Sequence, residues 1–222
     1  MVYRIVPAES LTSESELMEA LPKGPGTMTY FFSPFSPPTF EVLVRAGFCL
    51  ISVRQTYALR AIPAVTDDCP VLKRIAEVRT ELESGELTRM AVLIGESSRY
   101  FKDPLIPRER AVHLYETWLK NSIFGGRASE VVGLFDERRL AGIATLKDEE
   151  ERIVIDLFGV SAASQGRGVG TRLLHEAFRY ARERGCRELV VTTEGENVPA
   201  NRLYQKSGFL VTEVSFVFHR HT

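Results

Sequence analysis

The segment from Ser164 to Leu174, SQGRGVGTRLL, is the strongest constraint in this sequence, because a glycine-rich loop leads directly into a helix. Residues 152–160 before it have strand composition, and residues 170–184 after it have an amphipathic helical pattern that ends at Gly185. The first amides of a helix lack intrahelical partners and carry partial positive charge. The segment therefore predicts a strand–loop–helix unit suited to binding an anion such as a phosphate.

The glycines of this loop narrow the choice of ligand. Gly166, Gly168 and Gly170 lack a Cβ, so the loop can curl with its amides inward and admit a phosphate closely. No lysine follows them as in a nucleoside triphosphate loop, and the GxGxG spacing differs from the dinucleotide fingerprint. Taken alone, such a turn is equally compatible with a purely structural role.

Composition indicates a globular protein with either one large domain or one domain and a smaller one. The chain has 222 residues, 44% hydrophobic and 26% charged, with a formal net charge of −1. That balance disfavours nucleic acid and anionic membranes as partners. There is no apolar run of about 20 residues and no signal-peptide pattern at the N-terminus, so we expect a cytoplasmic protein.

The cysteines and histidines do not form a recognisable metal or disulfide pattern. The cysteines stand at positions 49, 69 and 186, and the histidines at 113, 175, 219 and 221. We expect the cysteines to be small buried residues and predict no metal site.

The chain divides by composition near residue 70. Residues 1–70 are rich in proline and predict a small N-terminal α/β lobe, and residues 71–222 predict the main domain. Trp118 falls on the apolar face of a helix that follows Pro107 and is expected in the core. The other expected strands are 27–32, 48–59, 75–79, 131–135, 140–146, 188–193 and 209–218, and the other expected helices are 39–46, 86–95 and 199–207.

Two segments together identify a family resemblance. One is Gln165-Gly166-Arg167-Gly168-Val169-Gly170, and the other is Asn197 to Phe209, which reads N-x-x-A-x-x-L-Y-x-K-x-G-F. In this order and spacing they resemble the GNAT superfamily of acyl-CoA N-acyltransferases over about residues 75–218. The resemblance implies an α/β fold with a mixed, mainly antiparallel sheet and flanking helices, here with the small N-terminal lobe added.

The resemblance also implies acetyl-CoA as the cosubstrate, without a metal. The loop amides would hold its pyrophosphate, the exposed backbone of the preceding strand would bond the pantetheine arm, and Val160 N–H would polarise the carbonyl. Asn197 matches a position that contacts this arm. Asn201 matches no position with an assigned role, and the alternative is a place on the helix surface. The implied cofactor residues are Phe158, Gly159, Val160, Gln165, Gly166, Arg167, Gly168, Val169, Gly170, Thr171, Asn197 and Tyr204.

The implied chemistry is attack of a neutral amine on a thioester. Tyr204 matches the tyrosine that protonates the departing thiolate, although it can equally pack on the cofactor. Asp156 is a candidate base, and strict alternation along its strand would place it on one face with Val154, Phe158 and Val160. The alternatives are that Asp156 is a structural hydrogen-bond acceptor and that a residue of the lobe, or water, is the base.

A looser resemblance concerns the acceptor. Ser98 to Pro104 and Ala111 to Ser122 look like dTDP-fucosamine acetyltransferase and its relatives, which acetylate the 4-amino group of dTDP-linked 4-amino-4,6-dideoxy sugars. This implies a dTDP-amino sugar as substrate. A nucleotide sugar needs a phosphate anchor and a platform for its base, for which Arg99 and either Tyr100 or Phe101 are candidates, and Asn121 and Ser122 are candidates to line the cleft. The alternatives are an ordinary salt bridge for Arg99 and a helix-end cap for Asn121 and Ser122.

Three further possibilities remain open at this stage. The acceptor is either this sugar or another amine, such as a peptide N-terminus, a polyamine or an aminoglycoside. The chain is either an enzyme or a non-catalytic acyl-CoA-binding module. The last strand, rich in Val and Phe, either pairs across a homodimer interface or lies inside the sheet.

Overall fold

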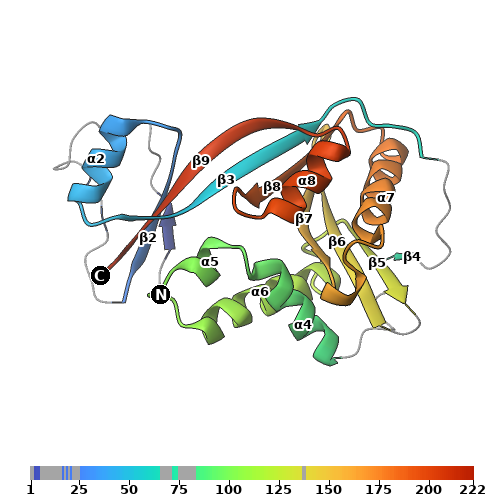
Figure 1. Cartoon of the computed structure of the whole chain (residues 1–222), viewed down its shortest axis with the longest axis horizontal. Helices are drawn as coiled ribbons and strands as arrows, with labels where there is room; N and C mark the ends of the chain where they lie inside the picture. Colours follow the sequence, from blue (N-terminus) through green and yellow to red (C-terminus); the bar gives the residue numbers. More distant parts are fainter. Residues whose placement is uncertain are drawn as a thin grey trace.

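The structure, a computed structural model, describes residues 3–5, 17, 19, 21, 26–65, 72–74, 84–136 and 139–222. Within these ranges the strands form one nine-stranded sheet in the order β1-β2-β9-β3-β8-β7-β6-β5-β4. Figure 1 shows the long strands β3 and β9 running from the lobe that carries α2 and β2 into the main body of the molecule.

The strands are β1 (Tyr3–Ile5), β2 (Met28–Ser33), β3 (Cys49–Leu59), β4 (Leu72–Arg74), β5 (Glu130–Asp136), β6 (Arg139–Glu149), β7 (Arg152–Val160), β8 (Glu188–Glu194) and β9 (Leu210–His221). The helices are α2 (Pro37–Arg45), α4 (Ser84–Gly95), α5 (Arg99–Lys102), α6 (Arg108–Ile123), α7 (Val169–Glu183) and α8 (Val198–Lys206), and a 3₁₀ turn spans Ala162–Ser164.

Most neighbouring strands are antiparallel, while β1 with β2 and β7 with β8 are parallel. Side chains of α7 and α8 form one hydrophobic cluster with one face of the central strands. Side chains of α4 and α6 form a second cluster with the opposite face. Both faces of the central strands are therefore covered, and the mainly antiparallel α/β fold predicted from the sequence is confirmed.

The pairing of β7 with β8 ends halfway along both strands. It runs from Arg152 opposite Glu188 to Ile155 opposite Val191 and then stops. On the other side of β7, Leu146 of β6 opposes Ile155 while Thr145 opposes Leu157, so Asp156 is an extra residue in the strand. Such a β-bulge bends its strand and increases the local twist. The sheet therefore opens between β7 and β8 beyond Asp156.

The bulge also exchanges the two faces of β7. Ile155 belongs to the cluster with α7, whereas Leu157, two residues later, belongs to the cluster with α4 and α6. Phe158 and Val160 pack against the α7 cluster instead. The prediction that Asp156 shares a face with Phe158 and Val160 is therefore wrong, because one inserted residue reverses the period of two.

Element positions otherwise agree with the sequence to within a few residues, and β7 begins and ends as predicted. The expected strand at 75–79 lies outside the described residues. Cys49 is exposed and Cys186 half-buried, so neither is the fully buried residue that the sequence predicted, and Cys69 is not described.

The lobe has its own apolar cluster but shares the sheet. Side chains of α2, β2, Phe48 and the end of β9 pack together. The strands on which they lie continue into the main body, so the division at residue 70 stays a prediction. Residues 216–219 of β9 lie between β2 and β3, which makes this part of β9 an inner strand. Among the described helices, none is long and apolar enough to cross a membrane.

Candidate functional site

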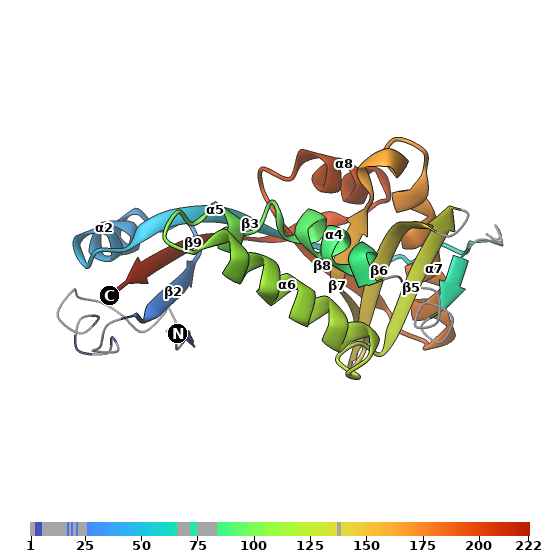
Figure 2. The same cartoon turned by 90° about the horizontal axis from the view of Figure 1, so that it is seen from below.

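A cavity of about 390 Å³ occupies the opening between β7 and β8. Its walls come from both strands, from the start of α5 and the middle of α6, from β2 and β3, and from α8. Figure 2 shows α8 above and α6 below these strands, so the cavity meets helices of both layers. Of the residues predicted for the site, those that line it are Arg99, Tyr100, Asp156, Phe158, Asn197 and Tyr204.

The glycine loop joins the far end of β7 to the start of α7. Gly166 and Gly168 have φ of +73° and +80°, a backbone region that favours glycine. A Cβ on either would meet no atom within 4 Å, so the space beside the loop is open. Gly168 is the N-cap of α7 and no side chain caps this end. The first-turn amides of α7, at Val169, Gly170 and Thr171, therefore lack intrahelical acceptors.

Other residues of this loop have structural contacts. Gln165 Nε2 donates to Val160 O at 3.3 Å, which ties the loop to the end of β7. Arg167 is exposed and pairs with exposed Asp136 at 3.3 Å, an interaction worth at most about 1 kcal/mol.

Gly159, in β7 before the loop, has a packing role. A Cβ at Gly159 would lie 2.6 Å from Ile94 Cγ1, so this glycine permits close packing of α4 on β7.

Asn197 and Asn201 fix the start of α8. Asn197 Oδ1 accepts from Ala200 N, and its Nδ2 donates to Thr193 Oγ1 at 3.1 Å, so Asn197 caps the helix from the cavity wall. Asn201 is buried rather than on the helix surface. Its Nδ2 donates to the carbonyls of Glu194 and Gly195, and its Oδ1 accepts from Tyr57 O–H at 2.9 Å. Asn201 thus holds α8 to the end of β8.

Tyr204 is 2% exposed and lines the cavity from α8. Its ring lies 5.7 Å from that of Tyr57 and 6.1 Å from that of Phe158. Burial, and then the neighbouring Tyr57, raise the pKa of Tyr204 far above its usual value. The hydroxyl is therefore protonated near neutral pH and is a potential proton donor.

Asp156 is held by three donors. Its Oδ2 accepts from Trp118 Nε1 at 2.8 Å and lies 3.4 Å from Arg127 Nε, and its Oδ1 lies 2.9 Å from Lys147 Nζ. Trp118 is half-buried and packs against the cluster of α4 and α6, as expected, and it also lines the cavity. Asp156 lies on the same side of β7 as α6 and provides the indole N–H with a partner.

Arg54 and Glu194, which the sequence did not single out, also line the cavity. They are directly opposite each other on β3 and β8. Burial raises the pKa of Glu194 above its usual range, while Arg54 acts in the opposite direction. Only the pairing of β3 with β8 brings these residues to the site, and nothing in their local sequence indicates it.

Of the residues assigned to the acceptor, Arg99 and Tyr100 reach the cavity and the other two do not. Arg99 is buried, and its Nη2 donates to Tyr100 O–H at 2.6 Å. Asn121 and Ser122 lie in the last turn of α6, outside the cavity lining. Asn121 O accepts from Gly125 N and Arg127 N, each at 3.0 Å, so this residue ends the helix.

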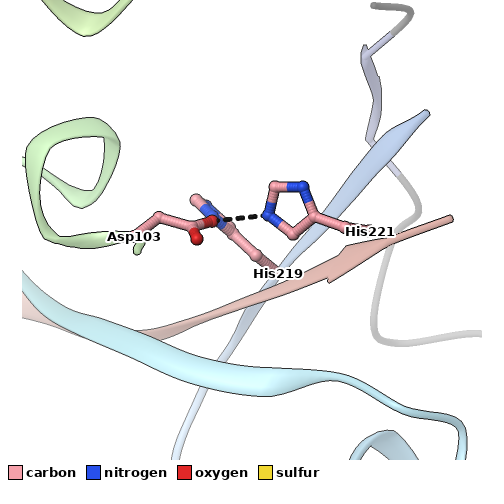
Figure 3. Close-up of side chains that lie close together, drawn as sticks. All are labelled: Asp103, His219 and His221. Carbon is pink, nitrogen blue, oxygen red and sulfur yellow. Dashed lines mark hydrogen bonds and ion pairs between the residues drawn. The ribbon is translucent and has the colours of Figure 1, made fainter. Parts of the chain in front are cut away.

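A second polar cluster lies beside the cavity, behind α5. Asp103 Oδ2 accepts from His219 Nδ1 at 2.6 Å and from His221 Nε2 at 2.7 Å, as Figure 3 shows. Two imidazoles and a carboxylate are a donor set that transition metals bind, and the three donor atoms lie within 4.8 Å of one another. The separations observed are hydrogen-bond lengths. In this structure the cluster connects α5 to β9.

Comparison with known proteins gives the same class of protein as the fold. The model of the acetyltransferase (GNAT) family matches residues 96–209. A GCN5-related N-acetyltransferase from Sphaerobacter thermophilus superposes with a TM-score of 0.59 at 16% identity, over 93% of this chain and 64% of that chain. This likeness concerns the fold.

Two curated relatives match this chain over only part of their own length. The spore coat polysaccharide biosynthesis protein SpsD of Bacillus subtilis is 26% identical over 62% of this chain and 48% of its own. A mycothiol acetyltransferase of Corynebacterium glutamicum is 31% identical over 41% of this chain and 32% of its own. The chain thus spans half or less of the length of these relatives.

The opened sheet, the helix-starting glycine loop and the cavity between them define a protein of the acyltransferase class. The family match covers about half of the chain. This chain belongs to the acetyltransferase (GNAT) family.

The Asp103 cluster generates a prediction about stability and pH. Burial lowers the pKa of His219 from 6.5 and outweighs its hydrogen bond to Asp103. Below pH 6.5 the unfolded chain therefore takes up a proton that folded His219 does not, and stability falls by up to about 1.4 kcal/mol per pH unit. Burial alone would raise the pKa of Asp103, but its hydrogen bonds lower it from 3.8. The stability that ionised Asp103 contributes is therefore lost only as the pH falls below 3.8.

His219→Asn retains a donor for Asp103 but does not titrate, so urea denaturation of this variant should depend less on pH between 7.5 and 5.5 than that of the wild type. Exposed His113→Asn is the control and should leave the dependence unchanged. Equal dependence in His219→Asn and wild type would contradict the assignment.

Proposed function

We propose that this chain is an acetyl-CoA-dependent N-acetyltransferase that acts on the amino group of a nucleotide-linked amino sugar, such as a dTDP-4-amino-4,6-dideoxy sugar. The observation that carries the proposal is the open seam between β7 and β8, which has the glycine loop at one end and Tyr204 in the cavity. The cytoplasmic location that the sequence predicts, and the homodimer that it leaves open, belong to the same proposal.

The seam suits the shape and chemistry of acetyl-CoA. Beyond Ile155, the edge of β7 that faces β8 has no strand partner, so the backbone of Phe158, Gly159 and Val160 can bond the pantetheine amides as an added strand would. The amides of residues 165–171 and the start of α7 provide donors for the pyrophosphate. Asn197 lies where this arm would enter the cavity.

The reaction joins the acceptor nitrogen to the acetyl carbon. The neutral amine attacks the thioester carbonyl, the new C–N bond forms, and the C–S bond breaks. Backbone N–H groups on the open edge of β7 stabilise the charge that develops on the carbonyl oxygen. The proton lost by nitrogen goes to a base, and the thiolate takes a proton from Tyr204.

Two carboxylates in the cavity are candidates for the base, and their surroundings differ. Asp156 already accepts from Trp118 and pairs with Lys147 and Arg127, so both of its oxygens are engaged in contacts within the chain. Burial raises the pKa of Glu194 above its usual value, which makes its carboxylate a stronger proton acceptor than an ordinary glutamate. We therefore assign the base to Glu194 and a positioning role to Asp156.

The choice of acceptor is supported by two observations. Arg99 and Tyr100, which the sequence assigned to the phosphate and base of a nucleotide, both line the cavity. The relative SpsD is named for spore coat polysaccharide biosynthesis, a process that uses sugar building blocks. Because another relative is named a mycothiol acetyltransferase, a different acceptor amine is the alternative.

The acceptor is identified by comparing different amines as substrates. Thiol release from acetyl-CoA should be fastest with a dTDP-4-amino-4,6-dideoxy sugar in a panel that also holds spermidine, an aminoglycoside and a peptide. The assay measures CoA release with a thiol reagent, and heat-treated protein is the control. Turnover of only a non-sugar amine would remove the sugar assignment and keep the activity, and silence with every amine would favour an acyl-CoA-binding module.

Tyr204→Phe tests the proton donor. The substitution keeps the ring contacts with Tyr57 and Phe158 and removes only the hydroxyl, so we expect kcat to fall about 10²-fold or more with acetyl-CoA affinity nearly unchanged. Binding is followed by calorimetry and turnover by thiol release. Tyr180→Phe is the matched control, because it also removes a buried tyrosine hydroxyl, one that bonds Asp148 and lies outside the cavity lining. Wild-type turnover in Tyr204→Phe would show that the tyrosine only packs.

Glu194→Gln compared with Asp156→Asn tests the base. A base must be ionised, so kcat/KM of the wild type should rise with pH through a pKa above 4.5, the ordinary glutamate value. In Glu194→Gln this limb should disappear and the rate fall by about 10²-fold. Asp156→Asn should keep the limb and lose mainly stability. The reverse result would assign the base to Asp156.

A further inference from the structure

The wall of the cavity opposite Tyr204 carries two arginines on one aromatic ring. The Cζ atoms of Arg54 and Arg99 each lie 4.8 Å from the centre of the Phe32 ring. Arg99 also lies 4.2 Å from the centre of Tyr30 and 4.7 Å from that of Tyr100. Aromatic faces attract cations, so these rings hold both guanidinium groups in place without consuming their N–H donors.

Arg99 has an unused donor group. The residue is 8% exposed, and its Nη2 donates to Tyr100 O–H. Its Nη1 is buried and has no hydrogen-bond partner in the part of the chain that the structure describes. Buried charged donors are normally satisfied, because leaving one unpaired costs free energy. Because Arg99 also lines the cavity, its guanidinium group can take a partner that comes from outside the chain.

The local charge is also unbalanced. Within the described ranges, neither Arg54 nor Arg99 forms an ion pair with a carboxylate. Asp156 is already paired with two cations, and Glu194 is the one carboxylate of the cavity left to offset both arginines. Burial, and then the charge of Arg99, lower the pKa of Arg54, which means that the two cations repel each other.

We propose that Arg99 and Arg54 form a subsite for an oxyanion, a phosphate or a carboxylate, carried by the acceptor substrate. The planar guanidinium fork matches both groups through paired N–H···O bonds. The inference rests on the proposed function for the identity of the acceptor as a substrate, but the anion site itself does not require turnover.

The subsite has two consequences for specificity. An acceptor anchored by its anion at Arg99 presents its amine from the lobe side of the cavity toward Tyr204 and Glu194. A polyamine has no anionic group and would place its own positive charge against two arginines, so this class of acceptor is disfavoured. Because Phe32 and Arg54 come from β2 and β3, the lobe supplies specificity to the main domain.

The test measures anion binding directly, with CoA in excess to occupy the glycine loop. Trp118 lines the cavity and is the single tryptophan of the chain, so its fluorescence reports occupancy. Inorganic pyrophosphate is titrated in one arm and succinate in the other. We expect saturable binding of at least one, weakened about 10-fold or more by Arg99→Met. Arg108→Gln is the control, since Arg108 is exposed and contacts only the outer ring of Phe101.

Arg54→Met provides a second variant should Arg99→Met unfold, and thermal melting checks both. Pyrophosphate binding without succinate binding supports a phosphorylated acceptor, and the reverse supports a carboxylated one. Equal affinity in wild type and variants, or no saturable binding of either anion, overturns the subsite. Anion binding that depends on Arg99 without turnover of any amine keeps the subsite and removes the proposed function. Sugar turnover with an unchanged KM in Arg99→Met keeps the proposed function and removes the subsite.

Discussion

The structure depends on one extra residue in β7. Asp156 bulges out of the ladder with β6, and immediately beyond it β7 ceases to pair with β8. A continuous sheet would bury these backbone edges and leave no cavity. The sheet instead leaves the edge of β7 open, Asp156 contacts Trp118, and the reversal of faces after the bulge directs Phe158 toward Tyr204. Cofactor groove and acceptor cavity thus have a single geometric origin.

The charges around this opening are arranged in two groups. On the α6 side, Asp156 is neutralised by Lys147 and Arg127 and serves as a fixed point of the scaffold. On the lobe side, Arg54 and Arg99 are held on aromatic rings and lack carboxylate partners, while Glu194 stands opposite Arg54. The first group pairs its carboxylate with two cations, whereas within the described residues the two arginines of the second group form no ion pair with a carboxylate. Function is therefore expected where the protein leaves charge unsatisfied.

The lobe is a working part of this arrangement. Its strands β2 and β3 bring Phe32 and Arg54 to the cavity, and the cluster of Asp103, His219 and His221 fastens α5, and with it Arg99 and Tyr100, to β9. Nearly the whole acceptor wall thus comes from segments before residue 101 or from their contacts with the last strand.

The sequence by itself determined the local features: the glycine loop, the amphipathic α7 and the limits of β7, because each depends on residues adjacent in the chain. Tertiary structure decided the rest. Glu194 and Arg54 meet through cross-strand register, His219 reaches Asp103 across more than a hundred residues, and Trp118 of α6 bonds Asp156 of β7. Contacts of this kind have no local signal, since they arise only when distant strands and helices pack together.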